Sequence, residues 1–273
     1  MKFDNYMIVT DLDDTFLGEN GSYVKRNLDA IEYFKQNGGL FTAATGRDHY
    51  FVKDPMPELI ELCNAPLITT NGACIYDPKT DKIERVLELP TRKVLEIIRE
   101  AQKIEPDISY RVSLDNGYIY EREDKIFFYD QGKYRYLVTV DKFDNYLDER
   151  WLKVVFYGEK EKIANASKYL FSLDEPDLHF VNALEINAEI LAKNATKGSK
   201  LSVLKEYLGK PELKIAAIGD YMNDYEMISS ADIPATVLNG NDILKKIPGV
   251  YVTCDHKEGA IADLIEHIEK DIL

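Results

Sequence analysis

Along the first 90 residues, short apolar runs alternate with longer segments whose apolar residues recur every three or four positions. The apolar runs have the length of buried strands, and the longer segments have the period of a helix. In the first longer segment Leu28, Ile31 and Phe34 fall on one face. Strands separated by helices predict a parallel sheet with right-handed crossovers. The expected strands are residues 6–10, 39–45 and 66–70, a return strand covers 82–89, and the expected helices are 24–36 and 48–63.

The pattern changes after about Pro90. A helical segment follows at residues 91–104, with Thr91 as its expected N-cap. Next come two alternating runs on either side of Asp-Asn-Gly at 115–117, which predicts a β-hairpin. This α+β character continues to about residue 188. The further elements expected here are strands at 151–158, 178–183 and 184–190 and a helix at 159–173.

Strand and helix segments alternate again in the last part of the chain. Because the two outer parts share one pattern and the middle has another, we expect an α/β fold in two domains. A doubly wound, Rossmann-like parallel-sheet core comprises residues 1–88 and 189–273, and residues 89–188 form an inserted α+β domain. The last part is expected to have helices at 197–208, 223–230, 241–246 and from 258, and strands at 213–219, 233–238 and 249–253.

Composition and charge narrow the possible partners. The 273 residues carry a net charge of −14 and no Lys/Arg-rich run, which argues against nucleic acid or an anionic membrane as the partner. No apolar run reaches the ~18 residues that a membrane-spanning helix needs. The three cysteines lie far apart and do not suggest a disulfide framework or a zinc site. The expected location is the cytoplasm.

Polar residues follow the first two predicted strands directly. Asp11 and Asp13 come after the first strand, and if the extended geometry persists both carboxylates lie on the same side. Thr45, Gly46 and Arg47 come after the second strand and offer a hydroxyl, a close backbone amide and a fixed positive charge, which suit a phosphate group. In a doubly wound sheet, ligands bind at this edge.

Two later segments add charge to the same expected crevice. Lys197 begins a predicted helix and would supply a cation, while Asp220 ends an apolar strand and Asp224 lies in the next helical turn. Four carboxylates, Asp11, Asp13, Asp220 and Asp224, suit a hard divalent cation, Mg²⁺ above all.

This set of residues fits the hydrolysis of a phosphate monoester. A phosphate dianion repels an attacking carboxylate, and Mg²⁺ together with Lys197 would remove that repulsion. Asp11 would then attack phosphorus as a covalent nucleophile. Asp13 would protonate the leaving alkoxide and later deprotonate the water that cleaves the aspartyl phosphate.

These residues occur in four ordered motifs that resemble those of the haloacid dehalogenase superfamily. The motifs are DLDDT at 11–15, ATGR at 44–47, Lys197, and GDYMNDYEM at 219–227. The long insertion and TTNGA at 69–73 are similar to the Cof-type subfamily with a type II, subclass B cap. One departure is VLNGN at 237–241, where Gly240 replaces an alanine common in the family. That loop is not expected to be catalytic.

The resemblance implies roles for individual residues. Asp11 would be the nucleophile, Asp13 the acid/base with its backbone carbonyl on Mg²⁺, and Asp220 a further metal ligand. Asp224 and Asn223 would support the metal site and Lys197, and Asn223 joins the phosphate-binding set. The inserted cap would close over the core and select a small phosphorylated metabolite, with a sugar phosphate favoured.

Several neighbouring residues have simpler interpretations. Asp14 and Thr15 are expected to shape the turn, and Lys200 is expected on a solvated face. Asn71 either contacts the substrate or serves only the geometry of an Asn-Gly turn. Tyrosines of the inserted domain are expected to pack on its sheet more than to stack on a sugar. They include Tyr110, Tyr118, Tyr120, Tyr129, Tyr134 and Tyr136.

Two other functions stay open. A phosphomutase would share the four motifs and return the phosphoryl group to the sugar. A phospho-aspartate signalling module would be phosphorylated at Asp11 and would not need Asp13 as an acid/base, although such a module has a far shorter chain.

Overall fold

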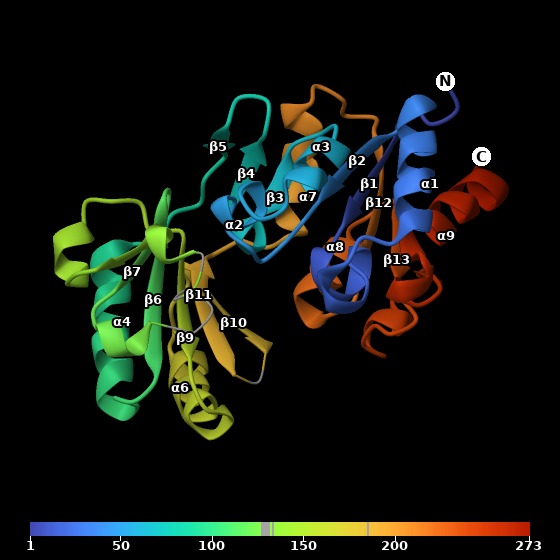
Figure 1. The fold of residues 1–273 in the computed structure, drawn as a ribbon. Coiled ribbons are helices and arrows are strands. Elements are labelled where there is room, and N and C mark those ends of the chain that lie inside the picture. The colour runs from blue at the N-terminus through green and yellow to red at the C-terminus, as the bar shows by residue number, and fades with distance from the viewer. Residues whose placement is uncertain (127–131, 133, 185) are drawn as a thin grey trace. The chain divides into compact units, whose positions relative to one another are not determined.

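The computed structural model describes residues 1–273 apart from 127–131, 133 and 185. The chain divides into two compact units (Figure 1). Unit 1 contains Met1–Arg85 and Thr196–Leu273, and unit 2 contains Val86–Ala195. Unit 2 is therefore an insertion between two segments that together build unit 1. No helix among the described residues is long and apolar enough to cross a membrane.

A five-stranded parallel sheet forms the centre of unit 1. β1 lies inside the sheet between β12 and β2, and all its residues are buried. This order places the ends of β1 and β12 side by side, although about 200 residues of chain separate them. The strands, in spatial order, are β14 (Tyr251–Val252), β13 (Ile233–Thr236), β12 (Lys214–Gly219), β1 (Tyr6–Thr10) and β2 (Leu40–Ala43).

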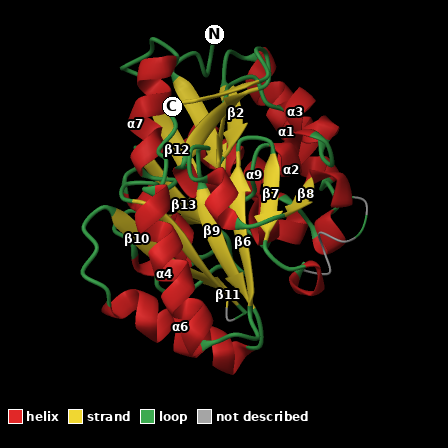
Figure 2. Cartoon of the chain, turned by 90° about the vertical axis from the view of Figure 1, so that its left-hand side faces the viewer, coloured by secondary structure: helices red, strands yellow, loops and turns green. Residues whose placement is uncertain are grey.

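Both faces of this sheet are covered, as a doubly wound fold requires. Ile8 of β1 belongs to a buried cluster with residues of α1 and α9, whereas Met7 and Val9 belong to a second cluster with residues of α7 and α8. Figure 2 shows α7 on one side and α1 with α9 on the other. The helices are α1 (Lys25–Gln36), α7 (Ser199–Tyr207), α8 (Tyr225–Ser229) and α9 (Ala260–His267).

The third predicted strand does not extend the parallel sheet. β3 (Leu67–Thr69) pairs antiparallel with β4 (Cys74–Asp77), which pairs with β5 (Lys82–Glu84), and one parallel bridge from Ala44 to Ile68 joins β3 to the end of β2. Asn71 and Gly72 reverse the chain with positive φ, which explains the antiparallel pairing.

Three further elements predicted for unit 1 also need correction, two before the insertion and one near the end of the chain. The expected helix at 48–63 is two short helices, α2 (Tyr50–Lys53) and α3 (Pro57–Leu62). Pro57 begins α3, where its missing N–H is not needed. The return strand ends at Glu84 because Arg85 adopts a positive φ. The helix expected at 241–246 is only a 3₁₀ turn, Leu244–Lys246.

In the described part of unit 2, six strands form a mixed sheet with α4 and α6 on the same face (Figure 2). The predicted hairpin is present, with Val112 opposite Ile119. Trp151 is fully buried and donates from Nε1 to the Tyr146 carbonyl at 2.9 Å. In spatial order the strands are β10 (Leu178–Leu184), β11 (Asn187–Ala192), β9 (Lys153–Tyr157), β6 (Ser109–Leu114), β7 (Gly117–Tyr120) and β8 (Val138–Val140), and the helices are α4 (Thr91–Ile104) and α6 (Lys160–Ser172).

Two expectations in unit 2 were wrong in detail. Pro90, not Thr91, holds the N-cap position of α4, and the Thr91 hydroxyl instead donates to the Leu147 carbonyl at 2.8 Å. The domain boundary expected at residue 188 falls inside β11. Because β11 pairs with β9 and β10, the whole strand has to remain in unit 2.

Most of the tyrosines singled out in the inserted segment are buried. Tyr110, for example, makes an edge-to-face contact with Phe156 at 5.1 Å between ring centroids. Tyr136 is exposed, and Tyr129 lies outside the described residues. The other buried tyrosines of the set are Tyr118, Tyr120 and Tyr134.

Candidate active site

The candidate site lies in unit 1 at the carboxyl ends of β1 and β12. Asp11 directly follows β1, and its N–H donates to the Ile218 carbonyl at 2.9 Å, which continues the pairing with β12 by one residue. The backbone that carries Asp11 is therefore held by the sheet. Its side chain is buried, with the residue 7% exposed.

Asp224 folds back against the end of β12. Its Oδ2 accepts the N–H groups of Asp220 at 3.1 Å and Tyr221 at 3.2 Å. Gly219 makes this possible, because a Cβ at that position would lie 2.4 Å from the Asp224 Cγ. Asp220 accepts a hydrogen bond from the Thr15 hydroxyl at 2.9 Å, so the turn after β1 is tied to the turn after β12.

Lys197 lies between two of these carboxylates. Its Nζ is 2.5 Å from Oδ1 of Asp11 and 2.6 Å from Oδ1 of Asp224, and the residue is only 1% exposed. The helix expected from residue 197 begins at Ser199 in the structure, so Lys197 belongs to the turn before α7. A charge buried this deeply is stable only when it is paired.

The charges within this cluster do not balance. Burial raises the pKa of the Asp11 carboxyl well above its usual range, and Asp224 and Asp220 add to this effect while Lys197 opposes it. Burial, followed by the charge of Asp224, raises the pKa of Asp220 to about 6. Burial alone would lower the pKa of Lys197, but Asp11 and Asp224 raise it above its usual range. Three carboxylates thus face one ammonium group, which favours a bound cation.

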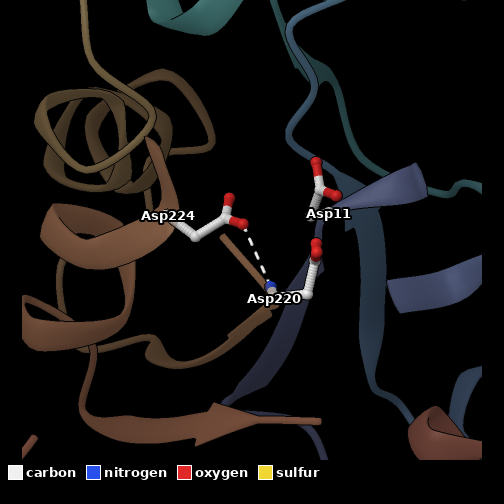
Figure 3. A group of neighbouring side chains, drawn as sticks. All are labelled: Asp11, Asp220 and Asp224. Atoms are coloured by element: carbon white, nitrogen blue, oxygen red, sulfur yellow. Dashed lines mark hydrogen bonds between the residues drawn. The ribbon is translucent and has the colours of Figure 1, made fainter. Parts of the chain in front are cut away.

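The cluster also has suitable geometry for a divalent cation. Carboxylate oxygens of Asp11, Asp220 and Asp224 lie within 4.8 Å of one another (Figure 3). Among the described residues, Oδ2 of Asp11 and Oδ2 of Asp220 have no hydrogen-bond donor, whereas both oxygens of Asp224 are occupied. Asp11 and Asp220 therefore fit a hard cation directly, and Asp224 is placed to support them.

Asp13 does not join this cluster through its side chain. Its carboxylate forms a two-pronged ion pair with Arg47, at 2.6 Å to Nη2 and 3.1 Å to Nε, and its side chain is 61% exposed. The expectation that Asp11 and Asp13 point to the same side required an extended chain. The strand ends at Thr10, and Leu12 already has helical backbone angles, so the alternation is lost before Asp13 and that expectation was wrong.

The residues expected to hold phosphate form two adjoining turns. The Thr45 hydroxyl accepts the Arg47 N–H at 3.1 Å, and the Asn71 N–H donates to the Thr45 carbonyl at 3.0 Å. A Cβ on Gly46 would lie 3.0 Å from Oδ1 of Asn71, so the turns are in close contact. Asn223 reaches the same amide from the β12 side, with its Nδ2 3.4 Å from Oδ1 of Asn71.

Asn71 therefore serves the turn, with a φ of 51°, and also lies beside the candidate site. The turn at Asn71 also packs closely against the segment that carries Lys197. Gly72 has a φ of 91°, and a Cβ there would lie 2.1 Å from the Thr196 carbonyl oxygen. All four sequence motifs thus meet through direct contacts within unit 1, although they lie far apart along the chain.

Two neighbouring residues differ from, or add to, what the sequence indicated. Lys200 was expected on a solvated face, but it is 3% exposed and donates to the Arg85 carbonyl at 2.6 Å. Lys200 is buried because it lies on the face of α7 that points toward Arg85, the last residue of Met1–Arg85. Asn239, which was noted only within a loop not expected to be catalytic, donates to the Asp14 carbonyl at 2.9 Å.

Comparisons with known proteins agree with this geometry. The family model of haloacid dehalogenase-like hydrolases matches residues 8–265. A 5-amino-6-(5-phospho-D-ribitylamino)uracil phosphatase of Bacillus subtilis is 26% identical over 272 residues, which cover 98% of this chain and 99% of the relative.

Solved structures extend the likeness to the fold. A haloacid dehalogenase-like hydrolase from Bacteroides thetaiotaomicron has a TM-score of 0.81 at 21% identity and covers 96% of this chain and 98% of its own. A subclass IIB sugar phosphatase has a TM-score of 0.75 at 17% identity, with the same coverage.

Proposed function

This chain belongs to the haloacid dehalogenase-like hydrolase family, and from that premise we propose that it is a Mg²⁺-dependent phosphatase that hydrolyses phosphate monoesters of small metabolites. The observation that carries the proposal is the buried Asp11–Lys197–Asp224 contact beside Asp220. A nucleophilic carboxylate held by a buried cation at the end of the central strand suits attack on a phosphoryl group.

In the proposed reaction, Asp11 attacks phosphorus and the bond to the leaving alkoxide breaks. Lys197 holds the Asp11 carboxylate through Oδ1, and its positive charge reduces repulsion between the carboxylate and the phosphate. Water then cleaves the aspartyl phosphate, which releases inorganic phosphate and restores Asp11.

Asp11 and Asp220 would hold the cation, and the resemblance adds the backbone carbonyl of Asp13. When bound, Mg²⁺ supplies positive charge next to the phosphoryl oxygens. Asp224 keeps Lys197 and the Asp220 backbone in place through its two oxygens. Thr45, Gly46, Arg47, Asn71 and Asn223 are proposed to line the phosphate position.

Asp13 is proposed as the acid/base that protonates the leaving alkoxide and then accepts a proton from water. Its ion pair with Arg47 holds the carboxylate at the exposed edge of the site. We propose that the leaving group lies at this exposed edge, within reach of Asp13. Arg47 therefore orients Asp13 in this proposal, in addition to lining the phosphate position.

For the substrate we propose a small phosphorylated metabolite, with sugar and sugar-alcohol phosphates as the favoured class. The names of two similar proteins support this class, since one acts on a phosphoribitylamino compound and one is a sugar phosphatase. Unit 2 is proposed to supply the residues that select the leaving group, as the resemblance implies.

The cytoplasm is the proposed location. The described cysteines are all free, which is typical of proteins in a reducing compartment. A net charge of −14 disfavours nucleic acid and anionic membranes as partners.

The first test is Asp11→Asn, assayed with p-nitrophenyl phosphate and Mg²⁺. Asparagine preserves the shape of the side chain but is a poor nucleophile, so we expect kcat to fall by about a thousandfold or more. Asp81→Asn is the control, because Asp81 lies on the exposed β4–β5 turn and pairs with Lys53. Wild-type turnover by Asp11→Asn would contradict the mechanism.

The second test identifies the substrate class. Phosphorylated metabolites are screened against the protein and ranked by kcat/KM, with released inorganic phosphate as the readout. We expect several sugar phosphates to rank highest. An isomerised sugar phosphate without released phosphate would instead indicate a phosphomutase.

A further inference from the structure

Building on the proposed function, we propose that Asn239 is a positioning residue that fixes the turn after Asp11 and thereby sets the affinity of the site for Mg²⁺. Asn239 lies in the loop after β13 and is separated from Asp14 by 225 residues of chain. Its contacts, the strain in the turn and the space beside the turn support this role.

The turn is strained at Asp14. Asp14 has a φ of 58° and a ψ of 13°, a left-handed conformation that Asp adopts more readily than most residues but that costs more than the right-handed one. The peptide between Asp13 and Asp14 takes its orientation from this conformation. The same peptide carries the Asp13 carbonyl, which the resemblance assigns to the metal.

Side chains from three separate elements hold the carbonyls that follow. Asn239 donates to Asp14 O at 2.9 Å, Asn27 of α1 to Phe16 O at 3.4 Å, and the His256 ring pairs with Leu17 O at 2.7 Å. Asn239 is itself fixed, because its Oδ1 accepts the His256 N–H at 3.1 Å. Of the three, Asn239 contacts the strained residue directly.

Packing does not hold the outer side of the turn. A cavity of about 350 Å³ borders it, lined by residues that include Asp13, Asp14, Gly18 and Lys257. The turn therefore has room to move on this side. Hydrogen bonds such as that from Asn239 must supply the restraint that packing would otherwise provide.

The loop that carries Asn239 also holds the backbone of Asp220, the second residue of the metal pair. The Asn241 N–H donates to the Asp220 carbonyl at 2.9 Å. Gly240 lies between Asn239 and Asn241 in the chain. A Cβ on Gly240 would come within 2.8 Å of the Thr236 hydroxyl and 3.0 Å of the Val237 carbonyl. This close approach explains the glycine at a position where the family commonly has alanine.

Without the Asn239 donor, Asp14 can relax to a right-handed conformation. The Asp13–Asp14 peptide then rotates and changes the direction of the Asp13 carbonyl, which the resemblance assigns to the metal. Removing an outer partner of a metal site typically weakens metal binding by about 10- to 100-fold. We expect a loss of this size in Mg²⁺ affinity, with a smaller change in KM for p-nitrophenyl phosphate.

The test compares Asn239→Asp with wild type in the full-length protein. Aspartate can still accept the His256 N–H but cannot donate to Asp14 O. Two readouts are taken: the Mg²⁺ concentration that gives half of the maximal rise in Tm, and the Mg²⁺ concentration for half-maximal phosphatase activity. Both are expected to increase by about 10- to 100-fold.

Asn64→Asp is the matched control. Asn64 donates to Gly39 O at 3.1 Å and accepts the Phe41 N–H at 2.7 Å, so it has the same pattern at the opposite end of the sheet. This variant should lower Tm without changing the Mg²⁺ midpoints. An equal shift in Asn64→Asp would mean that general destabilisation causes the effect and would overturn the proposal.

A second variant tests the strain itself. Glycine adopts the left-handed conformation at little cost, so Asp14→Gly in the Asn239→Asp background should move the Mg²⁺ midpoints back toward wild type. Unchanged midpoints in Asn239→Asp would overturn the role of Asn239. Failure of the proposed function is separate, because it would show as a wild-type protein without phosphatase activity.

Discussion

At the scale of single residues, Lys197 combines two roles that are usually separate. It is a fully buried ammonium group that stabilises the fold only through Asp11 and Asp224, and it is also the cation nearest the proposed nucleophile. The same two contacts therefore determine stability and reactivity, and a substitution at Lys197 should change both.

We expect Lys197→Met to lose activity and stability together. Methionine fills a similar volume but leaves Asp11 and Asp224 buried without a counter-charge, a change that costs about 3–5 kcal/mol when one partner of a buried pair is removed. The measurements are phosphatase activity and the free energy of unfolding in urea. Activity near the wild-type level would contradict the proposed role.

Lys200→Met is the matched control for this experiment. Lys200 is similarly buried, but it donates to the neutral Arg85 carbonyl, and burial lowers its pKa. Its replacement leaves no carboxylate unpaired. We therefore expect retained activity and a smaller loss of stability than in Lys197→Met.

At the same scale, the sequence indicated which residue types form the site better than it indicated where their side chains lie. Asp11, Asp220 and Asp224 follow apolar strands, and strand order brings them together. The Asp13–Arg47 pair could not be foreseen, because the chain leaves the extended conformation at Leu12, directly after Asp11. Asn239 lies in the VLNGN loop that resembles the family's, but its role at the turn after β1 emerges only from its contact with Asp14.

At the scale of elements, the junction between β12 and the following turn sets the metal site. β12 ends at Gly219, where the chain must make room for Asp224 to accept two backbone N–H groups. Those bonds fix the Asp220 side chain relative to β1. The absence of a Cβ at Gly219 is therefore a structural requirement of the site.

Gly219→Ala should consequently reduce activity more than a surface substitution does. The new Cβ would lie 2.4 Å from Asp224 Cγ, so Asp224 must shift and Lys197 must follow. Overpacking of this kind costs about 1–3 kcal/mol. Activity and Tm are measured beside Gly132→Ala, where no heavy atom lies within 4 Å of the added Cβ. Equal activity in the two variants would contradict this view of Gly219.

Elements with a clear periodic pattern of apolar residues were predicted with the right bounds. Elements whose course depends on a neighbouring turn were not. β1 and α4 have the expected bounds, because a buried run and an amphipathic period specify them without help from distant residues. β3 pairs antiparallel with β4, in addition to its single parallel bridge to the end of β2, because positive φ values at Asn71 and Gly72 send the chain back on itself. Such turns are set by contacts that a single sequence does not display.

At the scale of the whole molecule, the chain builds two units with separate strand systems. The candidate metal ligands all belong to unit 1, whereas the single tryptophan, Trp151, is buried in unit 2. Intrinsic fluorescence therefore reports on unit 2, while far-ultraviolet circular dichroism reports on both units.

This distribution allows a test of where Mg²⁺ acts. A ligand at 100 times its Kd stabilises the state that binds it by about 2.7 kcal/mol. We expect Mg²⁺ to raise the unfolding midpoint of unit 1 in circular dichroism and to leave the Trp151 fluorescence midpoint nearly unchanged. Removal of Mg²⁺ with EDTA should reverse the rise. A shift confined to Trp151 fluorescence would contradict a metal site in unit 1.

The Lys200–Arg85 contact bears on whether the inserted unit can be removed or replaced by another domain. Arg85 is the last residue before the insertion, and Lys200 lies one helical turn after the chain returns at Thr196. One lysine side chain thus spans the distance between exit and return. A linker of a few residues could bridge that gap, and the five strands of unit 1 would keep their order. The junction is therefore a natural graft point, at which evolution or a protein engineer can exchange one inserted module for another.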